Sequence, residues 1–174
     1  MARNEIEIEA PPEAVFDVLS DPRSFARWVV GSQAIRRADP EWPAPGAAFD
    51  HAVGIGPLRL KDHSRVVESA RPTFLRMLVN ARPLTQAWVT LRVRGAEHGR
   101  TVVEMDERAA DQRSRLAFNP LTDPLIRLRN HESLRRLKAL AEGHEEIPGG
   151  EVPTREPHAA DGAVRGSSRP AAPG

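Results

Sequence analysis

Three side chains that can move protons, His51, Asp62 and Glu107, occupy strand positions that the local alternation otherwise gives to apolar residues. His51, for example, lies between Phe49 and Val53 on one strand face. An imidazole or carboxyl group held near a reacting atom can act as a general acid or base. Burying a polar group without a partner costs free energy, so each should be paired, hydrated or turned toward a ligand. These three are the candidate catalytic residues.

The same faces carry other polar residues among medium-sized apolar ones. Ser64 shares a strand face with Leu60 and Asp62, and Asn130 and Ser133 interrupt the apolar stripe of a helix near the C-terminus. A roomy apolar pocket with a few convergent polar groups is the usual composition of a small-molecule site. The predicted ligand-binding set is Phe49, His51, Leu60, Asp62, Ser64, Met77, Val89, Leu91, Met105, Glu107, Ile126 and Asn130.

A purely structural interpretation of these polar residues stays open beside the functional one. A single β-bulge reverses the parity of a strand and would turn Asp62, Ser64 or Glu107 toward solvent. Asn130 and Ser133 can equally bond to the backbone or to each other across a packed interface. We expect two or three of these polar residues, rather than all of them, to line one cavity.

Other chemistries find little support in the chain. It has no cysteine, which excludes thiol nucleophiles, thiolate metal sites and disulfides. The six histidines include no His-x-x-x-His pair, and His51 and His63 have opposite parity on adjacent strands, so we expect no metal and no cofactor. Gly54-Ile55-Gly56-Pro57 joins two strands and lacks the third glycine of a dinucleotide fingerprint. There is no G-x-S-x-G nucleophile motif.

The elements that must position these residues follow from hydrophobic periodicity and chain breakers. Alternation over 4–9 predicts a half-buried strand, and a helix begins at Pro12. A second short helix, capped by Asp21, runs through Trp28. Six runs rich in Val, Leu, Thr and Phe then predict long, twisted antiparallel strands over 32–38, 46–54, 58–69, 73–81, 85–94 and 100–108.

The strongest helix signal follows Asp123 and Pro124 and ends at Gly143. Nineteen residues at about 1.5 Å each give a length of about 28 Å, enough to lie across a whole sheet. Its apolar face consists of Ile126, Asn130, Ser133, Leu134, Leu137, Leu140 and Ala141.

The last 32 residues differ from everything before them. They contain five Pro and six Gly, and their largest apolar residues are the isolated Ile147, Val152 and Val164. Such a segment cannot bury enough apolar surface to offset the entropy of ordering it. We therefore predict a ligand-binding domain over 1–142 and a disordered tail over 143–174.

Several segments, taken in order, identify a family resemblance. They are Pro12-Glu13-Ala14-Val15-Phe16, Phe25-Ala26-Arg27-Trp28, Trp42-Pro43-Ala44-Pro45-Gly46, Glu107 at the end of the seventh strand, and Arg129-Asn130-His131-Glu132-Ser133-Leu134-Arg135-Arg136-Leu137-Lys138. Over roughly 2–142 the chain resembles the START-like, SRPBCC superfamily with its Bet v 1-like members. Within it, the chain resembles bacterial proteins labelled polyketide cyclase/dehydrase and lipid transport. The resemblance implies an α+β helix-grip fold, in which a seven-stranded curved antiparallel sheet and two short helices carry a long C-terminal helix over the concave face.

The resemblance also implies a hydrophobic ligand held between the sheet and the long helix. The first hypothesis is a protein that binds a lipid, a polyketide or an isoprenoid-like molecule. The alternative is an aromatase/cyclase-like enzyme that holds a poly-β-ketone chain in one geometry and uses acid and base residues of the cavity. A third hypothesis is an interaction module that uses the outer sheet face and the tail.

The composition argues against several classes of binding partner. The 25 basic and 24 acidic residues give a net charge of +1, which argues against nucleic acid. No apolar run approaches the roughly 20 residues of a membrane span, so we expect no integral membrane association. The first residues lack the apolar segment of a signal peptide, which predicts a cytoplasmic protein. Trp88 is predicted to point outward, which raises the hypothesis of a homodimer.

Overall fold

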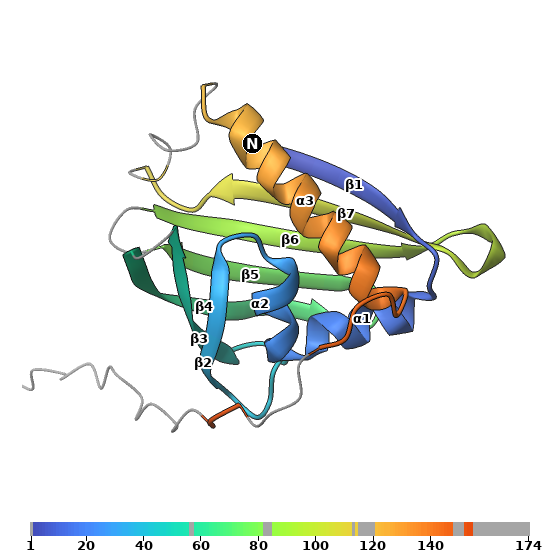
Figure 1. The fold of residues 1–174 in the computed structure, drawn as a ribbon, viewed down its shortest axis with the longest axis horizontal. Helices are drawn as coiled ribbons and strands as arrows, with labels where there is room; N and C mark the ends of the chain where they lie inside the picture. The colour runs from blue at the N-terminus through green and yellow to red at the C-terminus, as the bar shows by residue number, and fades with distance from the viewer. Residues whose placement is uncertain are drawn as a thin grey trace, which may run out of the picture.

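One curved antiparallel sheet and a long helix form the folded part of the chain (Figure 1). The computed structural model describes residues 2–55, 58–81, 85–112, 114, 121–147 and 152–154, and the side chains of 33, 53–55, 58–61, 81 and 85 lie outside the description. The strands are β1 (Ala2–Ile8), β2 (Ser32–Ala38), β3 (Ala48–Ile55), β4 (Leu58–Ala70), β5 (Phe74–Ala81), β6 (Thr85–Gly95) and β7 (Thr101–Ala109).

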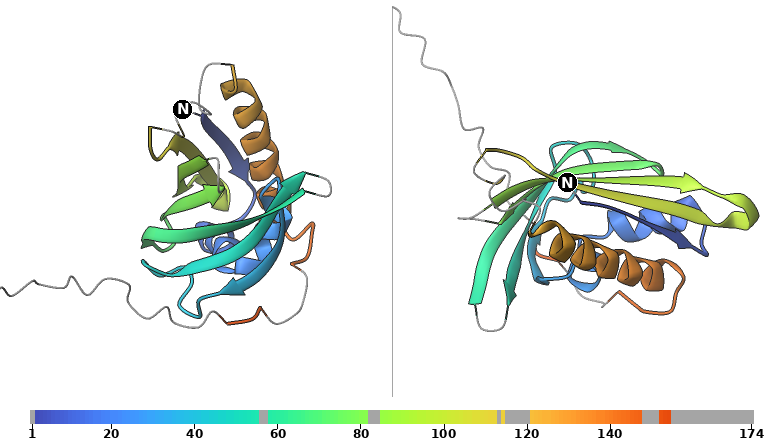
Figure 2. Two further views of the ribbon diagram at one scale, coloured as in Figure 1. Left: turned by 90° about the vertical axis from the view of Figure 1, so that its left-hand side faces the viewer. Right: turned by 90° about the horizontal axis from the view of Figure 1, so that it is seen from above.

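The seven strands have the spatial order β1-β7-β6-β5-β4-β3-β2. Strands β2 to β7 form a meander of consecutive antiparallel pairs, and β1 joins the sheet beside β7. Long strands of this kind twist, and Figure 2 shows the sheet curled around the side on which the helices lie. The predicted α+β helix-grip architecture is confirmed.

The helices are α1 (Pro12–Ser20), the 3-10 helix η1 (Pro22–Ser24), α2 (Phe25–Trp28) and α3 (Asp123–Ala141). α1 has its proline in the first turn, where no backbone donor is lost, and the Asp21 carboxylate accepts the Arg23 N–H at the start of η1. α3 packs mainly against β1 and also touches α1, α2 and β7. It therefore covers the concave face from one side of the sheet (Figure 2).

An aromatic cluster closes the part of the core beside α2. The Phe25 ring lies 4.9 Å from Trp28, 5.5 Å from Trp42 and 4.7 Å from Phe49, centroid to centroid. Trp42 donates its indole N–H to the Leu19 carbonyl at 3.2 Å. Offset and edge-on ring pairs of this kind add stabilisation beyond the apolar area that they bury.

The outer, convex face of the sheet is charged. Asp106 accepts two hydrogen bonds from Arg108, at 2.8 and 2.9 Å, which hold the pKa of that carboxyl below its usual value. Trp88 points outward as predicted, but the Arg76 guanidinium lies over its ring, 4.8 Å from the centroid. The half-buried indole is thus covered in part by a side chain of its own chain. The homodimer stays a prediction.

Part of the predicted tail lies against the domain. Ile147 and Val152 are half-buried against the core, and the Ala38 N–H at the end of β2 donates to the Pro153 carbonyl at 3.1 Å. These contacts attach 152–154 to the edge strand of the sheet. Residues 155–174 lie outside the described part of the chain, and their predicted disorder stays a prediction. Among the described residues, no helix is long and apolar enough to cross a membrane.

Candidate functional site

A buried polar network on β2, β3 and β4 contains two of the predicted catalytic residues. His51 and Asp62 are opposite each other in the β3–β4 register, with His51 Nε2 3.2 Å from an Asp62 carboxylate oxygen. The hydroxyl of Ser64 lies 3.3 Å from the same nitrogen, and the hydroxyl of Ser32 lies 3.1 Å from Nδ1. His51, Asp62 and Ser64 are each at most 4% exposed. The predicted inward orientation of these three side chains is confirmed.

The contacts of Asp62 hold its carboxylate beside the His51 imidazole. One Asp62 oxygen lies at ion-pair distance from His51 Nε2, which also lies within hydrogen-bond distance of the Ser64 hydroxyl. Nδ1 lies within hydrogen-bond distance of the Ser32 hydroxyl. The other Asp62 oxygen accepts the His63 backbone N–H at 2.6 Å, which fixes the carboxylate. The His51 imidazole thus lies between the hydroxyls of Ser32 and Ser64, with the Asp62 carboxylate at ion-pair distance, and the half-buried Ser32 hydroxyl is the most exposed member of this group.

A second polar cluster joins β7 to α3. One Glu107 oxygen accepts a hydrogen bond from the Asn130 amide at 2.9 Å and a further one from the Arg129 guanidinium. Asn130 is fully buried and Glu107 is 4% exposed, whereas the Arg129 side chain is 42% exposed. Both predicted residues face inward, and they satisfy each other across the interface between the sheet and the helix.

The strand register excludes the bulge that would turn Asp62 and Ser64 toward solvent. A β-bulge does occur in β4, but it lies between Val66 and Glu68, beyond Asp62 and Ser64, and leaves their parity unchanged. Ser133 accepts the Val30 backbone N–H at 3.1 Å, so this residue ties α3 to the segment before β2. Of the two polar residues in the α3 stripe, Ser133 therefore has a packing role.

The apolar residues of the inner face become more accessible toward one end of the sheet. In the cross-strand row Val93–Val103 both side chains are fully buried. Three inward-facing rows further along, Val79 is half-buried and Ala87 retains 6% exposure. Val89, next to Glu107 in the register, also retains 6%. The inner face is thus closed beside α1 and looser beside the Glu107 cluster.

The structure places most of the predicted ligand-binding set on this inner face. The buried side chains are Phe49, Met77, Val89, Leu91 and Met105, together with the polar residues already described. Ile126 is half-buried on α3. The side chain of Leu60 lies outside the described residues. No hydrogen bond within the described residues links the His51 network to the Glu107 cluster, so the structure brings the polar residues together as two groups.

Two residues of these groups, Ser32 and Arg129, are not among the site residues predicted from the sequence. Ser32 begins β2, where register shifts at Ser32/Ala34 and Ile35/Arg37 break the alternation that would have assigned it a face. Arg129 precedes Asn130 on α3 and reaches Glu107 from an exposed position, where no apolar pattern marks it. Within the described part of the chain, no three His, Cys, Asp or Glu side chains converge as a metal site would require.

Replacing Glu107 by alanine is expected to destabilise the fold by about 1–3 kcal/mol, because the buried Asn130 amide loses its acceptor. Glu107→Gln keeps a carbonyl oxygen at that place and should cost clearly less. The exposed Arg129 contributes little to either value. Urea denaturation of both variants measures the difference, and equal free energies of unfolding would contradict the assigned role of the acceptor.

Comparison with known proteins agrees with the fold. The family model for polyketide cyclase/dehydrase and lipid transport matches residues 2–142. A protein of Chromobacterium violaceum superposes with a TM-score of 0.60 at 19% identity, covering 80% of this chain and 96% of its own. Ara h 8.0201 gives a TM-score of 0.58 at 14% identity, covering 82% and 94%. DynU16, described as a putative protein in the dynemicin biosynthetic locus, gives 0.58 at 16% identity, covering 79% of this chain and 45% of its own.

No curated protein matches the chain. The structural neighbours are too distant in sequence to show more than the fold. The family match spans both polar groups and the whole inner face, and by that match the chain belongs to the polyketide cyclase/dehydrase and lipid transport family.

Proposed function

We propose that this protein binds a small apolar molecule between the inner face of the sheet and α3. The observation that carries the proposal is the gradient of exposure along that face, from fully buried Val93 to half-buried Val79. Apolar surface that the chain's own atoms leave accessible is available to an apolar ligand. The His51 network and the Glu107 cluster lie beside this looser end and supply a few fixed polar groups, as small-molecule sites do.

The ligand class follows from the composition of this lining. Aliphatic side chains and methionines predominate, and the whole chain has no tyrosine. We infer a mainly aliphatic ligand, such as a lipid, polyketide or isoprenoid-like molecule, with one oxygen-bearing end near the polar groups. The family description, which includes lipid transport, agrees with this class.

Val89→Trp tests the site directly. Val89 points inward in the looser region, and the added ring would occupy the space assigned to the ligand. We expect affinity for the neutral probe N-phenyl-1-naphthylamine to fall by about tenfold or more, equivalent to about 1.4 kcal/mol. Fluorescence titration measures the dissociation constant, and thermal melting checks that the larger side chain has not unfolded the protein.

Val67→Trp is the matched control, because Val67 is 44% exposed at the bulge of β4. This variant should bind the probe like the unaltered chain. If Val89→Trp binds as tightly as the control while remaining folded, the inner-face site is refuted.

A second candidate function, a cyclase/dehydrase-like enzyme, is favoured by the cluster of Ser32, His51 and Asp62. His51 could accept a proton from a bound poly-β-ketone through the Ser32 hydroxyl, with Asp62 stabilising the charged imidazole. Positioned acids and bases contribute roughly 10²–10⁴-fold to rates. Asp62→Asn should therefore reduce formation of a cyclised product by about 100-fold or more.

The chain offers a matched control for that experiment. Asp50 and His63 form another histidine–carboxylate pair at 2.9 Å, in the next register position but partly exposed. Asp50→Asn should leave product formation unchanged. Chromatography of a poly-β-ketone thioester incubated with each variant measures the amount of cyclised product. Unchanged product formation in Asp62→Asn would contradict the enzyme function and leave ligand binding as the one proposed function.

A further inference from the structure

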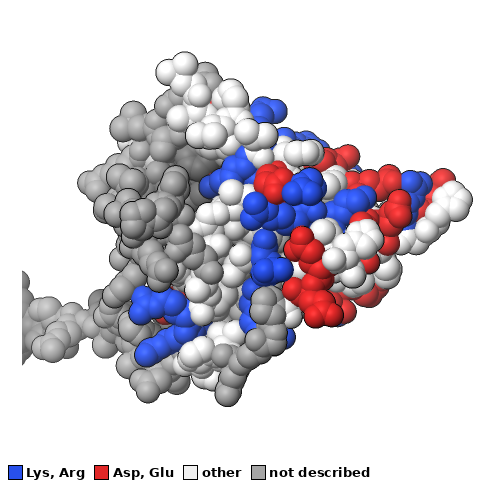
Figure 3. All heavy atoms as spheres, viewed as in Figure 1, with Lys and Arg blue, Asp and Glu red and all other residues white. Residues whose placement is uncertain are grey.

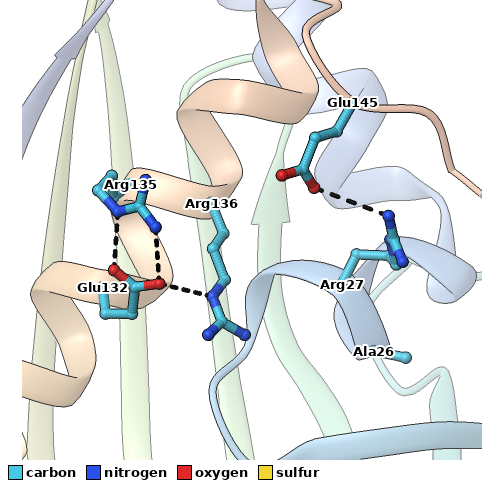
Figure 4. Close-up of a pocket in the computed structure, with 6 residues that line it drawn as sticks. All are labelled: Ala26, Arg27, Glu132, Arg135, Arg136 and Glu145. Carbon is cyan, nitrogen blue, oxygen red and sulfur yellow. Dashed lines mark hydrogen bonds and ion pairs between the residues drawn. The ribbon is translucent and has the colours of Figure 1, made fainter.

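A polar pocket lies on the surface between α2 and α3, apart from the inner face of the sheet. Its volume is about 410 Å³. The lining residues are Ala26, Arg27, Glu132, Arg135, Arg136 and Glu145 (Figure 4). The residues come from the end of α2, one face of α3 and the segment that follows α3. Three guanidinium groups therefore meet two carboxylates in one hollow.

Glu132 fixes two of the guanidinium groups. Its carboxylate accepts hydrogen bonds from Arg135 at 2.7 and 3.0 Å and from the Nε of Arg136 at 2.8 Å. These bonds lower the pKa of Glu132 to about 2, so the carboxylate stays ionised at physiological pH. Both of its oxygens are occupied, and its charge is opposed by two cations. Glu132 thus orients the arginines and leaves the hollow with an excess of positive charge.

The remaining donors of the pocket are available to a ligand. The two terminal nitrogens of Arg136 make no hydrogen bond to any residue that the structure describes. Figure 4 shows this guanidinium extending between Glu132 and the Ala26 end of α2. Arg27 approaches Glu145 at 3.8 Å, which is an ion pair but longer than a hydrogen bond. The Glu145 side chain is 46% exposed and can turn to solvent when a stronger anion enters.

We propose that this pocket binds a phosphate group. The planar fork of arginine donates two parallel hydrogen bonds to phosphate oxygens, and such charge-assisted bonds are stronger than neutral ones. A phosphate between Arg27 and Arg136 would take the place of the Glu145 carboxylate beside Arg27. The volume of about 410 Å³ leaves room for a larger molecule that carries the phosphate. Figure 3 shows Lys and Arg side chains on the face that carries α3, with Asp and Glu side chains interspersed among them.

Nuclear magnetic resonance titration of the full chain with inorganic phosphate tests the proposal. At fixed ionic strength maintained with chloride, phosphate should shift the Nε–Hε resonances of Arg27 and Arg136 in a saturable way. Arg136→Ala removes the unoccupied donors and should weaken binding by about tenfold or more. Glu145→Gln removes the competing carboxylate and should tighten it. Arg94→Ala, on the outer sheet face, is the control and should bind as before.

Flotation with vesicles distinguishes the source of the phosphate. Binding to phosphatidic acid vesicles, but not to neutral phosphatidylcholine, that is lost in Arg136→Ala would support a lipid headgroup. Phosphate binding without vesicle binding would support a soluble phosphorylated molecule. Shifts that do not saturate, or that persist equally in Arg136→Ala and Arg94→Ala, overturn the proposal. None of these outcomes depends on the apolar site.

Discussion

Leu137→Ala is expected to lower the free energy of unfolding by about 2–5 kcal/mol. Leu137 is fully buried on the face of α3 that packs onto the sheet. Removing three of its carbons loses the transfer free energy of those atoms and leaves a cavity that a closely packed interface cannot fully refill. Alanine and leucine have similar helix propensities, so the loss reports packing rather than helix formation. Urea denaturation gives the free energy of each variant.

Leu128→Ala provides the control on the same helix. Leu128 is 66% exposed, and its truncation should change stability by about 0.5 kcal/mol or less. Comparable losses at both positions would mean that α3 does not hold the fold through its inner face. A large loss at Leu137 alone would confirm that this face closes the space above the sheet.

Asp62→Ala is expected to destabilise the protein by about 1–3 kcal/mol, because the part-buried His63 backbone N–H loses its acceptor and the buried His51 imidazole loses the carboxylate beside it. His51 Nε2 would keep the 3.3 Å contact to Ser64, and the His63 backbone N–H would lose its 2.6 Å bond. The imidazole is too deeply buried to recover these contacts from bulk water without local opening. Thermal or urea unfolding measures the loss, and a variant as stable as the unaltered chain would contradict the network.

Asp62→Asn separates stability from proton transfer. The side-chain amide retains an oxygen for the His63 N–H and offers an N–H to His51 Nε2. An imidazole that accepts this N–H carries its proton on Nδ1 and donates toward Ser32, whereas a carboxylate at position 62 favours a proton on Nε2. We expect a smaller loss of stability than in Asp62→Ala and a change of His51 tautomer in nitrogen-15 spectra. An unchanged tautomer would show that Asp62 does not set the proton position.

The inner face could be predicted from the sequence because its parity is maintained along each strand. A period of two placed His51, Asp62 and Glu107 on the same side as their apolar neighbours, and the register confirms that placement. The one bulge of β4 falls beyond the polar residues, so it did not disturb the pattern. The order of the strands could be predicted from the same period of two, together with the Gly, Pro and Asp residues that separate one strand from the next.

The partners of these residues could not be predicted, because they depend on contacts between distant segments. Ser32 reaches His51 across an irregular edge pair, and Arg129 reaches Glu107 from the exposed side of a helix. The surface pocket likewise joins Arg27 to Arg136, which only the packing of α2 against α3 brings together. Leu125, which does not belong to the predicted apolar stripe of α3, is exposed.

Native mass spectrometry of the full chain, purified under gentle conditions, tests the proposed inner-face site most directly. The account predicts a second species, heavier by one apolar molecule, that disappears on denaturation and appears in an organic extract. In Val89→Trp the same preparation should give the mass of the chain alone. Only the unliganded mass, both after purification and after incubation with lipids, polyketides and isoprenoids, would contradict the account.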